Sequence, residues 1–289
     1  QDAAARVQDG ADLAERLSSG PVVVLARVVE DFGKATLALE RVYRTPVELP
    51  ERIRLSYQGD NIARNPDEPP FQPLEGETAV FVLERWTDYY GELGDADLYR
   101  PAQSYRSRIP LPEEGRQALV LAVEKLVRYE DTDDRSNAER DLRRWLEGRN
   151  PWLIDAALHH AALYGPIDER WTRGLIEHVQ ASNPRRRELA VRALGLGLAR
   201  GRLGAADEGP GAAASGDREL CRRALVQAAR TDPEADVRRL AVRALGRSGL
   251  TGLTPLLEVI AARDEDQNVR YEAETLLLHT RQQQADSKR

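Results

Sequence analysis

Four histidines are the side chains best suited to bind a metal ion or to transfer a proton near neutral pH: His159, His160, His178 and His279. A regular helix would direct the adjacent rings of His159 and His160 to different faces. Neither the His-x3-His nor the His-Glu-x2-His spacing of zinc sites occurs. The spacing therefore predicts no metal centre and no cofactor.

An acidic connector offers a second group of ligands, with the carboxylate and amide oxygens that calcium prefers: Asp131, Asp133, Asp134 and Asn137. The EF-hand pattern fails, because Arg135 occupies the fifth loop position and no glycine follows it. We expect a solvated acidic linker.

Glycine motifs could mark phosphate binding or a nucleophile. Gly195-x-Gly197 closes an apolar helix instead of following a strand, which excludes a dinucleotide-binding turn. The segment 246–249, Gly-Arg-Ser-Gly, lacks the Gly-x-Ser-x-Gly spacing of a nucleophile elbow. We therefore expect a protein that is not an enzyme.

Two sets of residues could instead bind another macromolecule. Aromatic side chains, which cover a large area at low entropic cost, surround a predicted hairpin over 91–97: Trp86, Tyr89, Tyr90, Tyr99 and Tyr105. Arginines recur along the predicted helices and could line one surface: 185–187, Arg192, Arg222, Arg223, Arg238, Arg239 and Arg243. The predicted partner-binding residues are Trp86, Tyr89, Tyr90, Tyr99, Arg186, Arg239 and Arg243. Packing in the core or on the rim of the barrel, for the aromatics, and a solvated helix face, for the arginines, are the alternatives.

Composition limits the class of protein. The chain has 289 residues, 41% of them hydrophobic and 31% charged, which is typical of globular proteins and long enough for two domains. No segment has the roughly 18 consecutive apolar residues that a membrane-spanning helix needs. Residues 1–136 carry a net charge of −9 and residues 137–289 carry +3. A value of +3 is weak for a nucleic-acid binder, so protein partners or other copies of the chain are expected.

The expected compartment follows from residues that are missing. The sequence contains no methionine and starts at Gln1, which favours secretion or a periplasmic location after removal of a signal peptide; a cut at a domain boundary is the alternative. The single Cys221 excludes a disulfide scaffold. Asn-x-Ser/Thr is also absent, which favours a bacterial source. Only three lysines stand beside 39 arginines, a ratio that indicates a GC-rich genome or a thermophile.

The elements that must position these residues fall into two halves. Up to about residue 110 the apolar pattern has a period near two, which predicts a short helix over 11–17 and a small curled sheet or barrel. The predicted strands are 22–30, 35–43, 52–57 and 78–84, with weaker ones at 97–100 and 105–109. Beyond residue 113 the period is near 3.6, and the seven residues 189–195 recur unchanged as 240–246.

The helical half resembles HEAT-type repeats. Helix-opening pairs occur at Asn150-Pro151, Asn183-Pro184 and Asp232-Pro233, and the period is about 33 residues once an insertion at 201–216 is removed. The segments 236–238 and 268–270 each carry Val-Arg before an apolar helix, as the second helices of such repeats do. We expect four helix pairs, over 137–165, 168–200, 217–248 and 251–282. The resemblance implies an α-solenoid that binds proteins.

The N-terminal half resembles the OB-type barrel of netrin-like domains and tissue inhibitors of metalloproteinases. The resemblance depends on the strand order and on Gly76-Glu77 before an apolar strand. It implies an OB-like barrel, although the inhibitors' N-terminal cysteine is replaced by Gln1.

The predicted fold is therefore α+β with two domains. Residues 1–112 form a small OB-like β-barrel with a short N-terminal helix, 113–136 a connecting helix and acidic linker, and 137–289 a HEAT-type α-solenoid. The expected function is a secreted, non-enzymatic protein-binding or assembly scaffold that can self-associate into a ring or filament. A protease inhibitor acting through the barrel, or an enzyme of unrecognised type, is the alternative.

Overall fold

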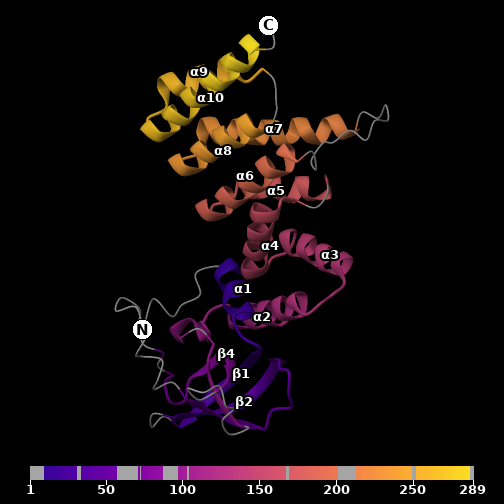
Figure 1. The fold of residues 1–289 in the computed structure, drawn as a ribbon, viewed down its shortest axis with the longest axis vertical. Helices are drawn as coiled ribbons and strands as arrows, with labels where there is room; N and C mark the ends of the chain where they lie inside the picture. Colours follow the sequence, from indigo (N-terminus) through magenta and orange to yellow (C-terminus); the bar gives the residue numbers. More distant parts are fainter. Residues whose placement is uncertain are drawn as a thin grey trace. The chain divides into compact units, whose positions relative to one another are not determined.

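A computed structural model describes residues 10–30, 34–56, 71, 73–86, 97–102, 104–166, 169–200, 213–248 and 252–286. The chain forms two compact units (Figure 1). Unit 1 contains residues 1–141 and 148–156, and unit 2 contains residues 142–147 and 157–289. Helices α3 (Arg135–Leu146) and α4 (Pro151–Tyr164) therefore contribute residues to both units. The fold class is the predicted one, an N-terminal barrel followed by a helical solenoid.

Unit 1 contains a closed β-barrel. Its strands are β1 (Val22–Glu30), β2 (Lys34–Arg44), β3 (Arg52–Ser56), β4 (Thr78–Arg85), β5 (Leu98–Pro101) and β6 (Arg108–Pro110). Five strands close the ring in the order β1-β2-β3-β5-β4-β1, because β4 pairs back with β1. The β3–β5 pair is parallel and the other pairs are antiparallel. This is the strand order of an OB-type barrel, with β6 added along β4.

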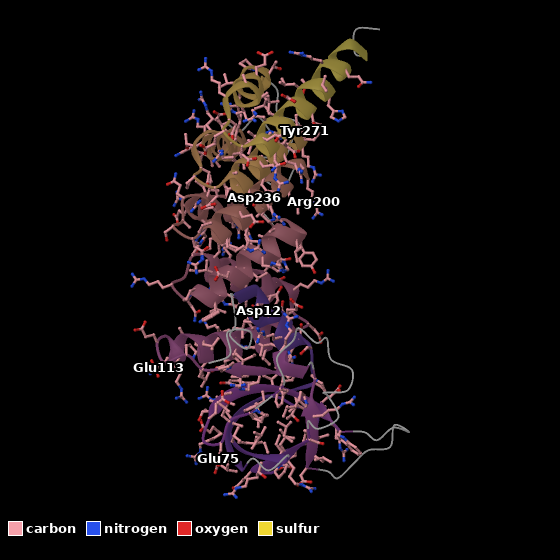
Figure 2. The ribbon with its side chains drawn as sticks, turned by 90° about the vertical axis from the view of Figure 1, so that its left-hand side faces the viewer. Asp12, Glu75, Glu113, Arg200, Asp236 and Tyr271 are labelled. Carbon is pink, nitrogen blue, oxygen red and sulfur yellow. The ribbon has the colours of Figure 1, made fainter. Side chains whose placement is uncertain are left out.

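Side chains at alternate positions of the strands point inward and fill the barrel. Side chains occupy its interior (Figure 2), and the buried cluster takes alternate residues of β1 together with large side chains from the other strands: Val22, Val24, Ala26, Val28, Leu37, Ile53, Leu55, Phe81, Leu83 and Tyr99. The intervening Val23 and Leu25 are also buried and lie opposite Val82 and Val80 of β4. The first five residues of β1, 22–26, are thus buried on both faces, which explains their continuous apolar run; Arg27 is exposed.

One strand prediction was wrong in part. The structure has a 3₁₀ turn, η2 (Ser104–Ser107), where the sequence predicted the first half of a strand over 105–109. Only Arg108–Pro110 pairs with β4. Such a short strand carries too few alternating residues for its ends to be read from sequence.

Two helices lie entirely in unit 1. Helices α1 (Gly10–Ser18) and α2 (Arg116–Glu130) contact each other, and α2 also contacts β2. Leu13 and Leu17 of α1 are fully buried, as are Leu119 and Val123 of α2. Arg44 on β2 joins strand to helix: its Nη2 lies 2.6 Å from Glu130 Oε2 and its Nε 2.8 Å from Asp131 Oδ1.

Unit 2 is built from stacked helix pairs. After the 3₁₀ turn η3 (Glu169–Trp171) come α5 (Thr172–Val179), α6 (Pro184–Ala199), α7 (Ala213–Thr231), α8 (Ala235–Arg247), α9 (Thr254–Arg263) and α10 (Gln267–Asp286). We call the first helix of each pair helix A and the second helix B. The B helices α6, α8 and α10 contact one another in that order. Among the helices of the described residues, none is long and apolar enough to cross a membrane.

Candidate functional site

The turns between helices A and B repeat the same polar contacts from one repeat of unit 2 to the next. Asp232 follows α7, and its Oδ1 accepts a hydrogen bond from the backbone N–H of Glu234 at 2.9 Å. Asp264 follows α9 and accepts from the backbone N–H of Asp266 at the same distance. Each aspartate thus closes a local turn before a B helix, as short side chains that bond two residues ahead commonly do.

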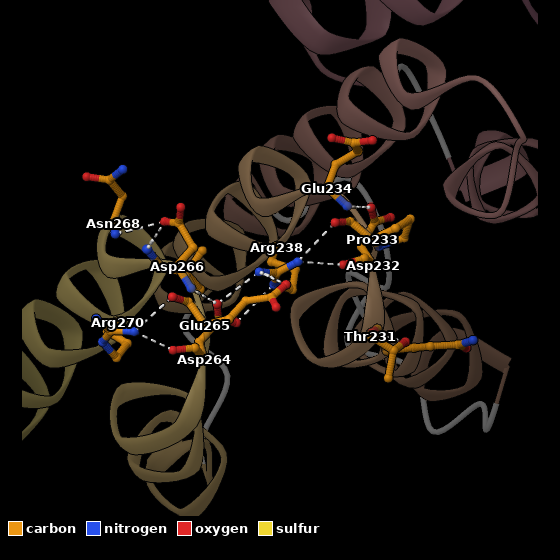
Figure 3. Close-up of polar contacts among 12 residues, drawn as sticks. Thr231, Asp232, Pro233, Glu234, Arg238, Asp264, Glu265, Asp266, Asn268 and Arg270 are labelled. Atoms are coloured by element: carbon orange, nitrogen blue, oxygen red, sulfur yellow. Dashed lines mark hydrogen bonds and ion pairs between the residues drawn. The ribbon is translucent and has the colours of Figure 1, made fainter.

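The same aspartates also bind an arginine of the preceding repeat. Figure 3 shows Arg238 between two turns. Its Nη1 donates to the carbonyls of its own turn, Asp232 at 2.8 Å and Pro233 at 3.2 Å. Its Nε and Nη2 donate to the two carboxylate oxygens of Asp264, at 2.9 and 3.0 Å. Arg238 therefore stabilises the turn before its own helix and also binds the turn of the next repeat.

Arg187 makes the same contacts one repeat earlier. Its Nη1 donates to the carbonyls of Ala181 and Ser182, at 3.0 and 3.1 Å. Its Nε and Nη2 donate to Asp232, at 2.8 and 3.1 Å. Both ion pairs are buried, with side-chain exposure of 9% or less at all four residues. We call these two pairs the arginine ladder.

Burial and ion pairing shift the pKa of Asp264 in opposite directions. Desolvation alone would raise the pKa of this carboxyl group. The hydrogen bonds from Arg238 and from the backbone of Asp266, together with the charges of Arg238 and Arg270, outweigh desolvation, and the pKa of Asp264 lies below its ordinary value. The hydrogen bond to Asp264 also raises the pKa of Arg238. The pair is therefore ionised at neutral pH.

Two glycines allow the B helices to approach closely. A Cβ at Gly195 of α6 would lie 2.5 Å from the Cβ of Ala244 on α8. A Cβ at Gly246 of α8 would lie 2.4 Å from Leu276 Cδ2 on α10. These glycines end the two copies of the repeated heptapeptide, so the repetition encodes a helix-helix contact.

The predicted partner-binding arginines have different environments. Arg186 is half-buried and makes a polar or ring interaction. Arg239 pairs with exposed Asp236 at 2.9 Å on its own helix. Arg243 reaches α10, where its Nη2 lies 2.6 Å from Glu272 Oε2. Arg238, also counted in the predicted surface row, is instead buried in the ladder.

The predicted aromatic cluster is only partly described. Trp86 is half-buried at the end of β4, and its backbone N–H donates to Leu98 O at 3.1 Å. Tyr99 is 1% exposed and belongs to the barrel core, so its ring cannot line an open surface. Tyr89, Tyr90 and the side chain of Tyr105 lie outside the described residues.

A groove lies in unit 1 between β2 and α2. Charged side chains line it together with the Tyr43 ring: Arg41, Glu124, Arg128 and Asp131. The Tyr43 hydroxyl is buried without a hydrogen-bond partner of good geometry among the residues that the structure describes, and burial raises its pKa. Arg41 lies 5.9 Å over the Tyr43 ring and 3.2 Å from Glu124, so these charges largely satisfy one another.

The histidines and the acidic connector are engaged in local contacts. His178 Nε2 lies 2.9 Å from Leu146 O. Burial, and secondarily the neighbouring His159, lower the pKa of His160. Asp131 binds Arg44, and Asp134 accepts the backbone N–H of Asn137 at 3.1 Å near the start of α3. Within the described ranges, no three His, Cys, Asp or Glu residues are placed to share a metal ion.

Comparison with known families supports the interpretation of these helices. Residues 221–285 match the family model for HEAT repeats. The matched HEAT segment runs from within α7 through most of α10 and includes the Arg238–Asp264 pair. The Arg187–Asp232 pair extends the same geometry one repeat toward the N-terminus. No curated protein matches the sequence.

Sequence reasoning missed the buried role of the ladder arginines. A signal was present, because Asp232 and Arg238 are separated by the same six residues as Asp264 and Arg270. Charged residues are rarely buried, so the pattern favoured a solvated arginine row. The partner that makes burial possible lies 26 or 45 residues away along the chain.

Proposed function

We propose that this protein is a non-enzymatic scaffold that binds another protein through its helical repeats. The observation that carries this proposal is the match to HEAT repeats at 221–285. The arginine ladder joins these helices to one another, so the buried pair of Arg238 and Asp264 holds the repeats together. Repeats of this type present extended surfaces, and a surface held rigid before binding loses less entropy when a partner docks.

The outward residues of α6 and α8 indicate the kind of contact. Arg192 is 48% exposed and pairs with Glu188 at 2.8 Å, and Arg239 pairs with Asp236. Exposed pairs of this sort contribute little to stability, so they can exchange partners at small cost. We infer a polar interface whose affinity falls as salt rises.

Site-specific photo-crosslinking tests the scaffold proposal. A benzophenone amino acid replaces Arg192 or Arg247 in the full chain, and Leu74, which is 56% exposed in unit 1, is the control position. We expect a protein to be crosslinked at the two helix positions, and Arg192→Glu to weaken its binding. Crosslinking only at Leu74, or turnover of a substrate that depends on one polar residue, would overturn the proposal.

Secretion and self-association are further parts of the proposal. The charges of −9 and +3 on residues 1–136 and 137–289 favour head-to-tail contact between copies. Light scattering at low salt should show mass increasing with concentration, and Arg239→Glu should reduce the increase. A monomer at every concentration would remove self-association without affecting binding to a different protein.

Protease inhibition by the barrel is the second candidate. Its only support is the OB-type strand order, which many unrelated proteins share. Failure to inhibit a panel of metalloproteases would remove it.

A further inference from the structure

Arg270 of α10 occupies the next position of the arginine ladder. Its Nη1 donates to the carbonyls of its own turn, Asp264 at 2.6 Å and Glu265 at 3.1 Å (Figure 3). These contacts match those that Nη1 of Arg187 and of Arg238 make. The Nε and Nη2 atoms of Arg270 donate no hydrogen bond to any residue that the structure describes. The edge that binds a carboxylate in both earlier arginines is therefore held in place, and no described residue occupies it.

The two earlier arginines show what this edge binds. In each case the partner is an aspartate directly after an A helix, Asp232 after α7 and Asp264 after α9. Two parallel N–H···O bonds match the spacing of a carboxylate, which gives geometric selectivity as well as charge attraction. The chemistry expected at Arg270 is thus an aspartate at the end of a helix.

Two large apolar side chains of the same helix are exposed. Tyr271 is 70% exposed and Leu278 is 67% exposed, and Figure 2 marks Tyr271 on α10. The two residues are seven positions apart, which places them on one face two turns apart. By repeat register, Leu278 corresponds to Gly195 and Gly246, the positions at which α6 and α8 receive the following B helix. At Leu278 the exposed face of α10 is thus the one that is covered in earlier repeats, whereas Tyr271 corresponds to Arg239, which is 37% exposed.

Another copy of this chain is poorly matched to the site. The corresponding positions in its earlier turns are Gly148 and Ala181, so its first repeats offer no aspartate to Arg270. Leu278 also stands where glycine allows close helix contact, so a HEAT helix could not approach as it does at Gly195. These differences favour a partner of another kind.

We propose that Arg270, Tyr271 and Leu278 form a docking stripe for a partner protein that presents a helix-terminal aspartate beside an apolar side chain. This inference rests on the proposed scaffold function and names the binding site and the chemistry that it recognises. Arg270 supplies the bidentate contact, and Tyr271 and Leu278 supply apolar contacts further along α10.

A peptide copied from this chain serves as the probe. It carries residues 252–266, which include α9 and the Asp264 turn that Arg238 binds, and the matched peptide carries Asp264→Asn. Anisotropy of the labelled peptides is measured with the full chain and its variants. We expect Arg270→Gln to weaken binding of the aspartate peptide about tenfold and to leave the asparagine peptide unchanged.

Tyr271→Ser and Leu278→Ser keep the test valid if Arg270→Gln unfolds α10, since Arg270 also holds its own turn. Both should weaken binding, whereas Leu163→Ser, at a 54% exposed residue of α4, should not. The proposal is overturned if neither peptide binds at millimolar concentration, or if all variants bind alike. A dimer of the full chain that Leu278→Ser dissociates would overturn it in favour of a second copy. A crosslinked partner that is insensitive to the three stripe variants would overturn it and leave the scaffold proposal standing.

Discussion

The guanidinium of Arg238 and the carboxylate of Asp264 form a buried bidentate pair between neighbouring repeats, with Nε–Oδ2 at 2.9 Å and Nη2–Oδ1 at 3.0 Å. Both side chains are less than 10% exposed. Because repeats in a solenoid contact only their neighbours, each such pair contributes directly to the coupling between two repeats. Stability in unit 2 should therefore respond strongly to loss of a single ladder residue.

Removing Asp232 should destabilise the protein far more than removing an exposed aspartate. Asp232→Ala leaves Arg187 buried without its carboxylate, which should lower the free energy of unfolding by about 3–5 kcal/mol. Asp236→Ala removes only the exposed pair with Arg239 and should cost about 1 kcal/mol or less. Urea denaturation measures both. Equal losses would show that the ladder is not a stabilising device.

Acid should abolish the contribution of Asp264. Its pKa is lower in the folded protein than the ordinary value of 3.8, so the stabilisation is complete above the unfolded pKa and is lost as the pH falls through the folded pKa. The difference in unfolding free energy between wild type and Asp264→Asn should be largest near neutral pH and should narrow below about pH 4. Urea titrations across pH 2–7 test this prediction, with Asp236→Asn as the control. A difference that does not depend on pH would contradict it.

The two interhelical glycines should differ in tolerance to alanine. At Gly195 the new Cβ meets the Cβ of Ala244, which cannot move independently of the backbone. Overpacking costs about 1–3 kcal/mol, more than the gain of up to about 1 kcal/mol in helix propensity. At Gly246 the nearest atoms belong to the end of the Leu276 side chain, which can shift. Thermal unfolding should show a lower Tm for Gly195→Ala and a smaller change for Gly246→Ala; the reverse order would contradict the packing described.

Tyr99→Phe should be neutral or stabilising. The Tyr99 hydroxyl is buried and finds no hydrogen-bond partner in the described part of the chain, and burial raises its pKa. Removing an unsatisfied polar group should change the unfolding free energy by between about 0 and +2 kcal/mol. Tyr99→Ala instead removes a core ring and should cost about 3–5 kcal/mol. A substantial loss of stability in Tyr99→Phe would mean that the hydroxyl is hydrogen-bonded in solution.

Local rules explain what the sequence predicted correctly. Strand β1 occupies the predicted range 22–30, because its valine-rich pattern does not match the 3.6-residue period of a helix. Asn183 was read as a helix opener, and its side chain accepts the backbone N–H of Arg185 at 2.9 Å before Pro184. The repeated heptapeptide indicated repeating B helices. The first two signals act between residues close together in the chain, and the third is a direct repetition that can be read without the structure.

The tertiary structure decided which charged and aromatic residues are buried. Alternation predicted strands but not the β1–β4 pairing that closes the barrel, since that contact joins segments about fifty residues apart. The sequence leaves Tyr99 open between a partner-binding surface and the core or rim of the barrel, and ring closure places it in the core. Arg187 and Arg238 resemble exposed arginines in composition, and only the approach of Asp232 and Asp264 from the next repeat offsets their desolvation. Residue type and spacing thus determined the elements, whereas burial depended on partners that folding brings together from distant parts of the chain.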